Sequence, residues 1–292
     1  MPQVRREDAD RCDHHRRSRA STRARTRRDR SERVSPFSPE VLALAESLNM
    51  HMPRREGEEC LVTPRYAAII GVEKDAPNNV VQRLRLLPDE VKGTVAEVRA
   101  LFAARDRHRI SWEVGDSATP TDLVERLQAE GMVPFPEESM ATGMVLGKPL
   151  VGPVGAVVVR KVLTFEDFLV ASEIYRTCFH GEVASPAELE ERFATKMAVP
   201  EFAAYLAWDG DRAIAAADAI FLPCGVVMCG GATLPEGRGK GAYRALVAAR
   251  WEEGRARGTP TLITQAGAMS RPILERLGFE EVVKIHILLD LF

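Results

Sequence analysis

The sequence predicts an α/β (α+β) fold in which helices flank a mixed central sheet, and it predicts two copies of this fold in tandem. Short apolar runs typical of strands alternate with segments whose apolar residues recur every three or four positions, as on one face of a helix. The same order of elements occurs twice, on either side of the Gly- and Pro-rich stretch 147–155. We therefore divide the chain into residues 1–36, 37–147 and 156–292.

Residues 1–36 differ in composition from the rest of the chain. They contain twelve arginines and six acidic residues, a net charge of +6, whereas the whole chain carries −2. Few of these residues are apolar enough to pack, so we expect this segment to be disordered. Two interpretations stay open: a nucleic-acid or anionic-surface arm, or a dispensable tail, which we prefer. No aromatic residue is interleaved for base stacking, so any nucleic-acid binding by the arm would be unspecific. Since we prefer the dispensable tail, a nucleic-acid partner is not expected.

Residues 37–147 are predicted to form the first copy. Its expected strands are 66–72, 80–86, 110–114 and 140–146, and its expected helices are 90–105 and 120–130. The first helix follows the turn 87–91, which contains a proline and two carboxylates but no glycine. Such a turn would repel a pyrophosphate. We therefore expect this copy to be degenerate, serving as structure or as a wall of the acceptor site.

Residues 156–292 are predicted to form the second copy. Its expected strands are 157–162, 202–208, 212–222, 225–234, 261–266 and 282–289, and its expected helices are 165–179, 186–197 and 242–257. A further helix is expected to begin after Ser270 as its N-cap, with Pro272 in its first turn, and to end at Gly278. The pair Gly230-Gly231 indicates a β-bulge in the strand 225–234.

A glycine-rich turn opens onto the helix 242–257. In it Gly237, Gly239 and Gly241 alternate with Arg238 and Lys240. Unpaired amides and the positive end of the helix dipole suit a phosphate or pyrophosphate there, and the two cations add charge. The turn is not a P-loop, because no Ser or Thr follows the Gly-Lys pair. A tight connection without a ligand is the alternative.

Two segments carry a resemblance to a known family. Arg238-Gly-Lys-Gly-Ala-Tyr243 resembles the Q/R-x-x-G-x-G/A motif of the GCN5-related N-acetyltransferase (GNAT) superfamily, and residues 270–279 resemble its later helix with a terminal Gly-Phe. The resemblance covers residues 157–292. Two positions depart from it: Tyr243 stands where the motif usually ends in Gly or Ala, and Leu274 stands where many members carry a tyrosine thought to protonate the departing thiolate.

The resemblance implies an N-acetyltransferase that uses acetyl-CoA as cosubstrate and an amine as acceptor, without a metal. The pantetheine arm would lie where strands 225–234 and 261–266 splay apart, and the pyrophosphate would rest on the amides of residues 238–243. The cofactor-binding residues implied are Thr233, Leu234, Arg238, Gly239, Lys240, Gly241, Ala242, Tyr243 and Ser270.

Direct transfer to an amine needs a neutral amine, a polarised thioester carbonyl and a proton for the thiolate. A backbone N–H near residues 228–231 could polarise the carbonyl. Four side chains are candidates for the base, and each could equally be an ordinary surface or structural group: Asp218, Glu182, Glu173 and His180.

One residue is a candidate for the general acid that protonates the thiolate, and another is a candidate for a nucleophile in a covalent mechanism. Ser270 lies one helical turn before Leu274 and could present its hydroxyl to the sulfur, although we favour a role as N-cap, with solvent or backbone donors serving the thiolate. Cys229 lies near the expected thioester, but a small buried thiol is the simpler interpretation.

Other classes of function compete with this one. A regulatory module that binds acyl-CoA without transfer is the main alternative, because the usual tyrosine is missing. Five scattered cysteines without a C-x-x-C spacing argue for reduced thiols and a cytoplasmic protein, and no apolar run reaches the length of a membrane span. The acceptor and the oligomeric state stay open, because substrate choice depends on loops without a transferable code.

Overall fold

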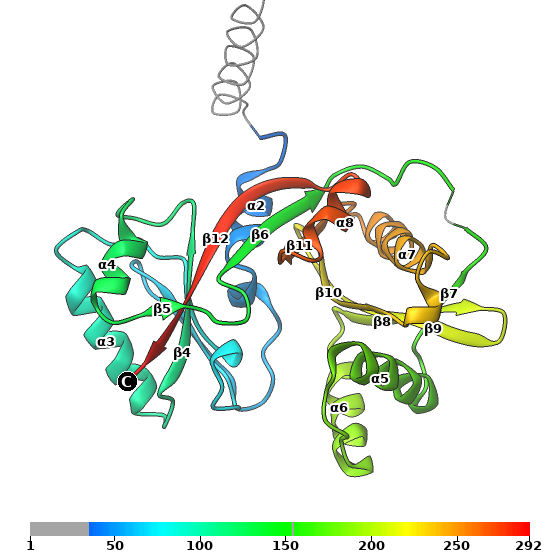
Figure 1. Ribbon diagram of the computed structural model, residues 1–292, viewed down its shortest axis with the longest axis horizontal. Coiled ribbons are helices and arrows are strands. Elements are labelled where there is room, and N and C mark those ends of the chain that lie inside the picture. Colours follow the sequence, from blue (N-terminus) through cyan, green and yellow to red (C-terminus); the bar gives the residue numbers. More distant parts are fainter. Residues whose placement is uncertain (1–34, 154) are drawn as a thin grey trace, which may run out of the picture. The chain divides into compact units, whose positions relative to one another are not determined.

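The strands pair into one mixed sheet in the computed structural model, which describes residues 35–153 and 155–292. In these residues the sheet has twelve strands: eleven follow the order β1-β2-β3-β4-β12-β6-β11-β10-β9-β8-β7, and β5 pairs with β12 (Figure 1). The predicted α/β class with a mixed sheet and flanking helices is confirmed. Of the segment 1–36, residues 1–34 lie outside the described residues, so its expected disorder and its interpretations as an arm or a tail stay predictions.

The N-terminal lobe, which we define as residues 39–134, holds the first five strands. Its elements are α2 (Pro39–Glu46), η1 (Leu48–His51), β1 (Glu59–Val62), β2 (Ala67–Ile70), η2 (Ala76–Asn78), β3 (Asn79–Gln82), α3 (Val91–Ala103), β4 (Arg109–Gly115), α4 (Leu123–Ala129) and β5 (Val133–Pro134). The three strands and two helices expected before residue 135 are present, with ends that differ by a few residues. The elements α2, η1, β1, η2 and β5 were not predicted.

The C-terminal lobe, which we define as residues 157–279, follows the predicted order closely. The elements after the N-terminal lobe are β6 (Met140–Leu146), β7 (Val158–Lys161), α5 (Phe165–Phe179), α6 (Pro186–Met197), β8 (Phe202–Asp209), β9 (Arg212–Leu222), β10 (Gly225–Thr233), η3 (Pro235–Gly237), α7 (Ala242–Ala256), β11 (Leu262–Ala266), α8 (Arg271–Arg276) and β12 (Glu280–Leu291). The bounds of α5, α6, β6 and β9 agree with the prediction at both ends.

The last strands of the two halves are exchanged. β6, the last strand of the first half, pairs antiparallel with β11 of the second half. β12, the last strand of the chain, pairs antiparallel with β4 of the N-terminal lobe and also with β6. These pairings join both halves into one sheet. The division of the chain at 147–155 stays a prediction.

Helices cover both faces of the C-terminal lobe (Figure 1). On one face α7 and α8 pack on a core that includes Leu246, Trp251 and Leu274. On the other face α5 packs through Phe168 and Ala171. In the N-terminal lobe α3 and α4 pack on a separate core around the fully buried residues Trp112, Phe102 and Leu127. Successive strand residues therefore contact different helices.

The unpredicted helix α2 packs on β6, β11 and β12. Its carbonyl oxygens at Ala45 and Glu46 each accept a hydrogen bond of 3.2 Å from Gln265 Nε2 on β11. The Glu46 carboxylate in turn accepts a 2.8 Å hydrogen bond from the amide of Ser117 after β4. The helix thus fastens the C-terminal lobe's strand β11 to the N-terminal lobe.

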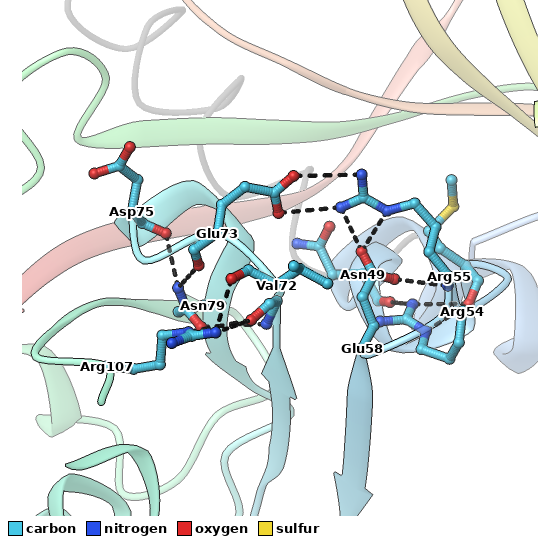
Figure 2. Close-up of polar contacts among 11 residues, drawn as sticks. Asn49, Arg54, Arg55, Glu58, Val72, Glu73, Asp75, Asn79 and Arg107 are labelled. Carbon is cyan, nitrogen blue, oxygen red and sulfur yellow. Dashed lines mark hydrogen bonds and ion pairs between the residues drawn. The ribbon is translucent and has the colours of Figure 1, made fainter. Parts of the chain in front are cut away.

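A polar network fastens the connection between η1 and β1 (Figure 2). Arg55 donates to Glu58 at 2.6 Å and forms an ion pair of 3.2 Å with Glu73. Asn79 Nδ2 donates to the carbonyl oxygens of Glu73 at 2.8 Å and Asp75 at 2.9 Å. The network joins this connection to the loop before β3. We therefore assign these polar side chains a structural role.

Candidate functional site

The strands β10 and β11 separate in the middle of the C-terminal lobe, as the resemblance implied. They pair in parallel at only two positions each, ending at Val227 and Ile263. One residue further, the Thr264 hydroxyl donates to the Met228 carbonyl at 3.3 Å. Beyond that contact the two strands no longer pair, and each offers backbone groups to the gap.

The predicted bulge lies beside this gap and is confirmed. The pairing of β10 with β9 shifts register between Cys229 and Ala232, and Gly230 adopts a φ of +54°, a backbone region that favours glycine. Burial raises the pKa of the Cys229 thiol to about 12. A thiolate nucleophile is therefore disfavoured near neutral pH, which supports the interpretation of Cys229 as a packed thiol.

The glycine-rich turn presents unsatisfied amides next to the gap. Gly241 is the N-cap residue of α7 with a φ of +82°, and it has no side chain to cap the helix. Within the described residues, the amides of Gly239, Gly241 and the first three residues of α7 donate to no protein acceptor. Together with the helix dipole, these donors form an arrangement suited to an anion.

The cations around this turn differ in their partners. Lys240 Nζ forms a 2.6 Å ion pair with Asp209, and both side chains are 47% exposed. Arg244 donates to the carbonyl of Pro153 in the connecting stretch at 2.9 Å. Arg238 is exposed and makes no ion pair with any described residue. Arg238 is therefore the cation whose charge is available without breaking a contact.

Thr233, Leu234 and Ser270 are less available than the resemblance implied. Thr233 pairs with β9 as the last residue of β10, and the amide of Leu234 donates to Ile214 at 2.9 Å. Ser270 occupies the predicted N-cap position of α8, but the prediction that its side chain caps the helix is wrong. Its backbone is helical instead of extended, and its hydroxyl donates to the Gly267 carbonyl at 3.4 Å.

The two positions that depart from the family's pattern lie on the α7 and α8 face. Leu274 is 2% exposed and packs in the core, so it offers neither a proton nor a hydrogen bond. Tyr243 packs against the same core. Its ring lies against Gly231, where an added Cβ would come within 2.9 Å of Cε2. Burial raises the pKa of Tyr243.

Among the four candidate bases, Asp218 lies beside the bulge. It is paired with Cys229 across β9 and β10 and is 8% exposed. Its Oδ1 accepts a 3.0 Å hydrogen bond from the Tyr175 hydroxyl, and its Oδ2 forms a 2.6 Å ion pair with Lys196. The structure thus assembles a hydrogen-bonded group of three polar side chains on the α5 and α6 face.

The other three candidates lie on the surface of α5 or after it. Glu173 is exposed and forms a 2.5 Å ion pair with Arg176, which lowers the pKa of the glutamate. His180 is the exposed C-cap residue of α5 with a φ of +55°. Glu182 is exposed in the loop that follows and makes no hydrogen bond or ion pair with a described residue.

Sequence reasoning missed Tyr175 and Lys196. A signal for Tyr175 was present, because it follows Phe168 by seven residues and Ala171 by four, which places it on the buried face of α5. Lys196 lies in the last turn of α6, and its approach to Asp218 depends on tertiary packing. No local pattern could have predicted that contact.

The corresponding turn of the N-terminal lobe is closed by its own side chain. The amide of Leu87 donates to Glu90 Oε2 at 2.8 Å, and Glu90 is the residue before α3. A carboxylate thus lies where the C-terminal lobe has free amides. This contact supports the view that the N-terminal turn does not suit a pyrophosphate.

Residues 35–153 and 155–292 contain no group of three or more His, Cys, Asp or Glu side chains placed to hold a metal ion. The four cysteines in this part of the chain, Cys60, Cys178, Cys224 and Cys229, are free thiols. None of the helices described there has the length and apolar character needed to cross a membrane.

Comparisons with known proteins agree with this architecture. Scans against protein-family models and against curated proteins return no match. Among solved structures, a GCN5-related N-acetyltransferase from Kribbella flavida aligns with a TM-score of 0.64 and 19% identity over 86% of this chain and 95% of its own. A tandem GNAT protein from the clavulanic acid biosynthesis pathway aligns with a TM-score of 0.57 and 16% identity, covering 86% and 93%.

A third similar structure comes from Sphaerobacter thermophilus and is also described as a GCN5-related N-acetyltransferase. Its TM-score is 0.58 at 14% identity, and the alignment covers 81% of this chain and 82% of that one. At these identities the likeness concerns the fold, and it extends over both lobes instead of the C-terminal half alone. The chain therefore has the fold of the GCN5-related N-acetyltransferases, in the tandem form.

Proposed function

We propose that this protein binds acetyl-CoA in its C-terminal lobe and transfers the acetyl group directly to an amine. The observation that carries the proposal is the row of unsatisfied amides at the start of α7, beside the gap between β10 and β11. Such amides suit the pyrophosphate of CoA, and the gap would admit the extended pantetheine arm. The solved structures of similar fold that are named as N-acetyltransferases support the same reaction class.

The residues nearest the gap can meet two of the three demands of the reaction. A backbone amide of the bulge around Gly230, where the pairing of β10 with β9 is interrupted, would polarise the thioester carbonyl, because a preorganised donor is worth most where charge develops. Asp218 provides a carboxylate beside the bulge. Neither Leu274 nor Ser270 has a proton directed to a sulfur, so we infer that solvent or backbone donors serve the thiolate.

Calorimetry with acetyl-CoA tests the binding part of this proposal. Loss of one charge-assisted hydrogen bond costs roughly 1.5–3 kcal/mol, so Arg238→Ala should weaken binding roughly ten- to a hundredfold. Gly241→Asp should weaken it more, because the residue needs a φ of +82° and a carboxylate would repel the pyrophosphate. Wild-type affinity in the Gly241→Asp protein would refute the assignment of this turn.

The buried Leu274 favours a second candidate function, an acyl-CoA-binding module without transferase activity. Both functions predict the same binding and the same effect of Gly241→Asp. Release of free CoA from acetyl-CoA in the presence of a broad panel of amines separates them. A protein that binds acetyl-CoA with micromolar affinity and releases no CoA with any amine would favour the module.

A further inference from the structure

The group formed by Tyr175, Asp218 and Lys196 has a definite orientation toward the bulge. The Tyr175 ring packs directly on Gly230: a Cβ added there would lie 3.2 Å from Cε1 and 3.3 Å from the hydroxyl oxygen. The phenol oxygen is thus next to the backbone that borders the gap between β10 and β11. Behind it, the hydroxyl donates to Asp218 Oδ1 at 3.0 Å.

Lys196 fixes the carboxylate from the opposite side. Its Nζ is 2.6 Å from Asp218 Oδ2 and 5.1 Å from the centroid of the Phe202 ring, so the ammonium has two partners. The Lys196 side chain is 41% exposed, whereas that of Asp218 is 11% exposed. The three groups therefore form a chain of hydrogen bonds that runs from the bulge, through a buried carboxylate, to solvent.

We propose that Tyr175 is a catalytic residue that relays a proton from the attacking amine to Asp218, with Lys196 as the positioning residue. This inference rests on the acetyltransferase function proposed above. It makes Asp218 the final proton acceptor, and it assigns the contact with the substrate to a tyrosine on α5. The phenol has both properties the relay needs: its proton already points to the carboxylate, and its oxygen has lone pairs free to accept.

The amine nitrogen forms a bond to the thioester carbon, and the carbon–sulfur bond breaks, so that CoA leaves with the electron pair as a thiolate. The N–H proton moves to the Tyr175 oxygen while the phenol proton moves to Asp218 Oδ1. Tyr175 ends as it began, and the neutral Asp218 later loses its proton to solvent past Lys196. The thiolate takes its own proton from solvent.

Electrostatics are consistent with the starting state. Burial and the neighbouring Asp218 raise the pKa of Tyr175 well above its usual value, so the resting phenol carries its proton. The buried Arg250 approaches from the α7 side and donates to the Asp218 carbonyl at 3.2 Å. It contacts the backbone of Asp218, which leaves both carboxylate oxygens to Tyr175 and Lys196.

Tyr175→Phe in the full chain tests the relay, because it keeps the ring on Gly230 and removes only the hydroxyl. The matched control is Tyr205→Phe: Tyr205 also donates to a carboxylate, that of Glu253 at 2.6 Å, but on the α7 face of the sheet. Each protein is measured for acetyl-CoA affinity and for CoA release with benzylamine, spermidine and glycinamide. Imidazole is then added at increasing concentration as an external base.

We expect Tyr175→Phe to lower kcat about a hundredfold, the usual effect of removing a general base, with acetyl-CoA affinity unchanged. Imidazole should restore part of that rate and leave the wild type and Tyr205→Phe unaffected. Asp218→Asn should show a similar loss, and the double variant should lose no more than either single one. Lys196→Met should lose activity, and Lys196→Arg should regain most of it.

The outcomes separate the two proposals. If the wild type binds no acetyl-CoA, the proposed function fails, and the relay fails with it. If the wild type binds acetyl-CoA but releases no CoA with any amine, the transfer part of the proposed function fails together with the relay, and the binding module is favoured. If the wild type transfers the acetyl group and Tyr175→Phe and Tyr205→Phe have equal rates, only the relay is overturned. Loss of activity in Tyr175→Phe without any response to imidazole also overturns it, because the hydroxyl would then act through structure alone.

Discussion

Glu113 on β4 links folding stability to pH, and Glu113→Gln tests the link. Its Oε1 accepts a 3.1 Å hydrogen bond from Asn49, and its Oε2 is shielded from solvent and accepts none within the described residues. Burial raises the pKa of Glu113 from 4.5 to about 7. On the adjacent strand, the buried Gln82 Oε1 also has no donor among the described residues. A proton on Glu113 would remove the charge from a carboxylate that has one hydrogen-bond donor and one unpaired oxygen.

The sign and size of the effect follow from linkage. Between about pH 4.5 and 7 the folded protein binds a proton at Glu113 that the unfolded chain has released. The contribution of this group to the free energy of unfolding therefore falls as the pH rises through that window. At about 1.4 kcal/mol for each pH unit of difference, the loss reaches roughly 3 kcal/mol above pH 7.

Glu113→Gln removes the charge at nearly constant volume. We expect the variant to match the wild type near pH 5 and to exceed it by roughly 2–3 kcal/mol at pH 8, measured by urea unfolding followed by circular dichroism. The nearby His51, whose pKa burial lowers, acts in the opposite direction but cancels in the comparison, because both proteins contain it. Glu125→Gln on the exposed side of α4 is the control. An identical pH dependence in wild type and Glu113→Gln would refute the reasoning.

Three further predictions concern the cofactor and the packing of the helices. Asp209→Asn should release Lys240 and tighten acetyl-CoA binding about two- to fivefold in calorimetry, the range expected for an exposed ion pair; unchanged or weaker binding would contradict it. Native mass spectrometry should find one CoA per chain, because the N-terminal turn is closed by its own carboxylate, and two would contradict it. Gly93→Ala in α3, where a Cβ meets nothing within 4 Å, should stabilise by about 0.5–1 kcal/mol. Gly254→Ala in α7 should destabilise by about 1–3 kcal/mol, because the Cβ would lie 2.7 Å from Val226, and equal unfolding midpoints for the two variants would contradict both.

The helices α5 and α6 could be predicted to the residue because their signals are local. Thr164 accepts a hydrogen bond from the amide of Asp167, and Ser185 forms a complete capping box with Glu188. These side chains act within four residues of the helix start. The same holds for the glycine-rich turn, where three glycines and a helical pattern suffice to indicate free amides.

The partners of β6 and β12 could not be predicted in this way. Each is an apolar strand that ends its half of the chain, and its pattern fits the neighbouring strand of either half equally well. The choice depends on contacts between residues more than a hundred positions apart, such as Leu289 with Ser111. Helix α2 was not predicted for a related reason. It is short, and the contacts that stabilise it are made with β6, β11 and β12, which are distant in the sequence.

The candidate site was predicted on the α7 and α8 face of the sheet, whereas on the α5 and α6 face only Asp218 was predicted. The turn 238–243, the bulge and Asp218 follow from residue types visible in the sequence. Tyr175 and Lys196 do not, because a tyrosine on an apolar helix face and a lysine in a last turn have ordinary structural explanations. They become functional candidates only because tertiary packing brings both of them to the carboxylate of Asp218.

The polar groups around the bulge indicate which of two proton transfers the protein assists: protonation of the CoA thiolate or deprotonation of the amine. On the α7 and α8 face, Leu274 and Tyr243 are packed into the core, and Leu274 removes the usual donor to a thiolate. On the α5 and α6 face, Tyr175, Asp218 and Lys196 form a connected chain. A CoA thiolate is a good leaving group, whereas an amine must lose a proton to become an amide. Under the proposed function, the side chains that can transfer a proton therefore serve deprotonation of the amine, which is the step that needs more assistance.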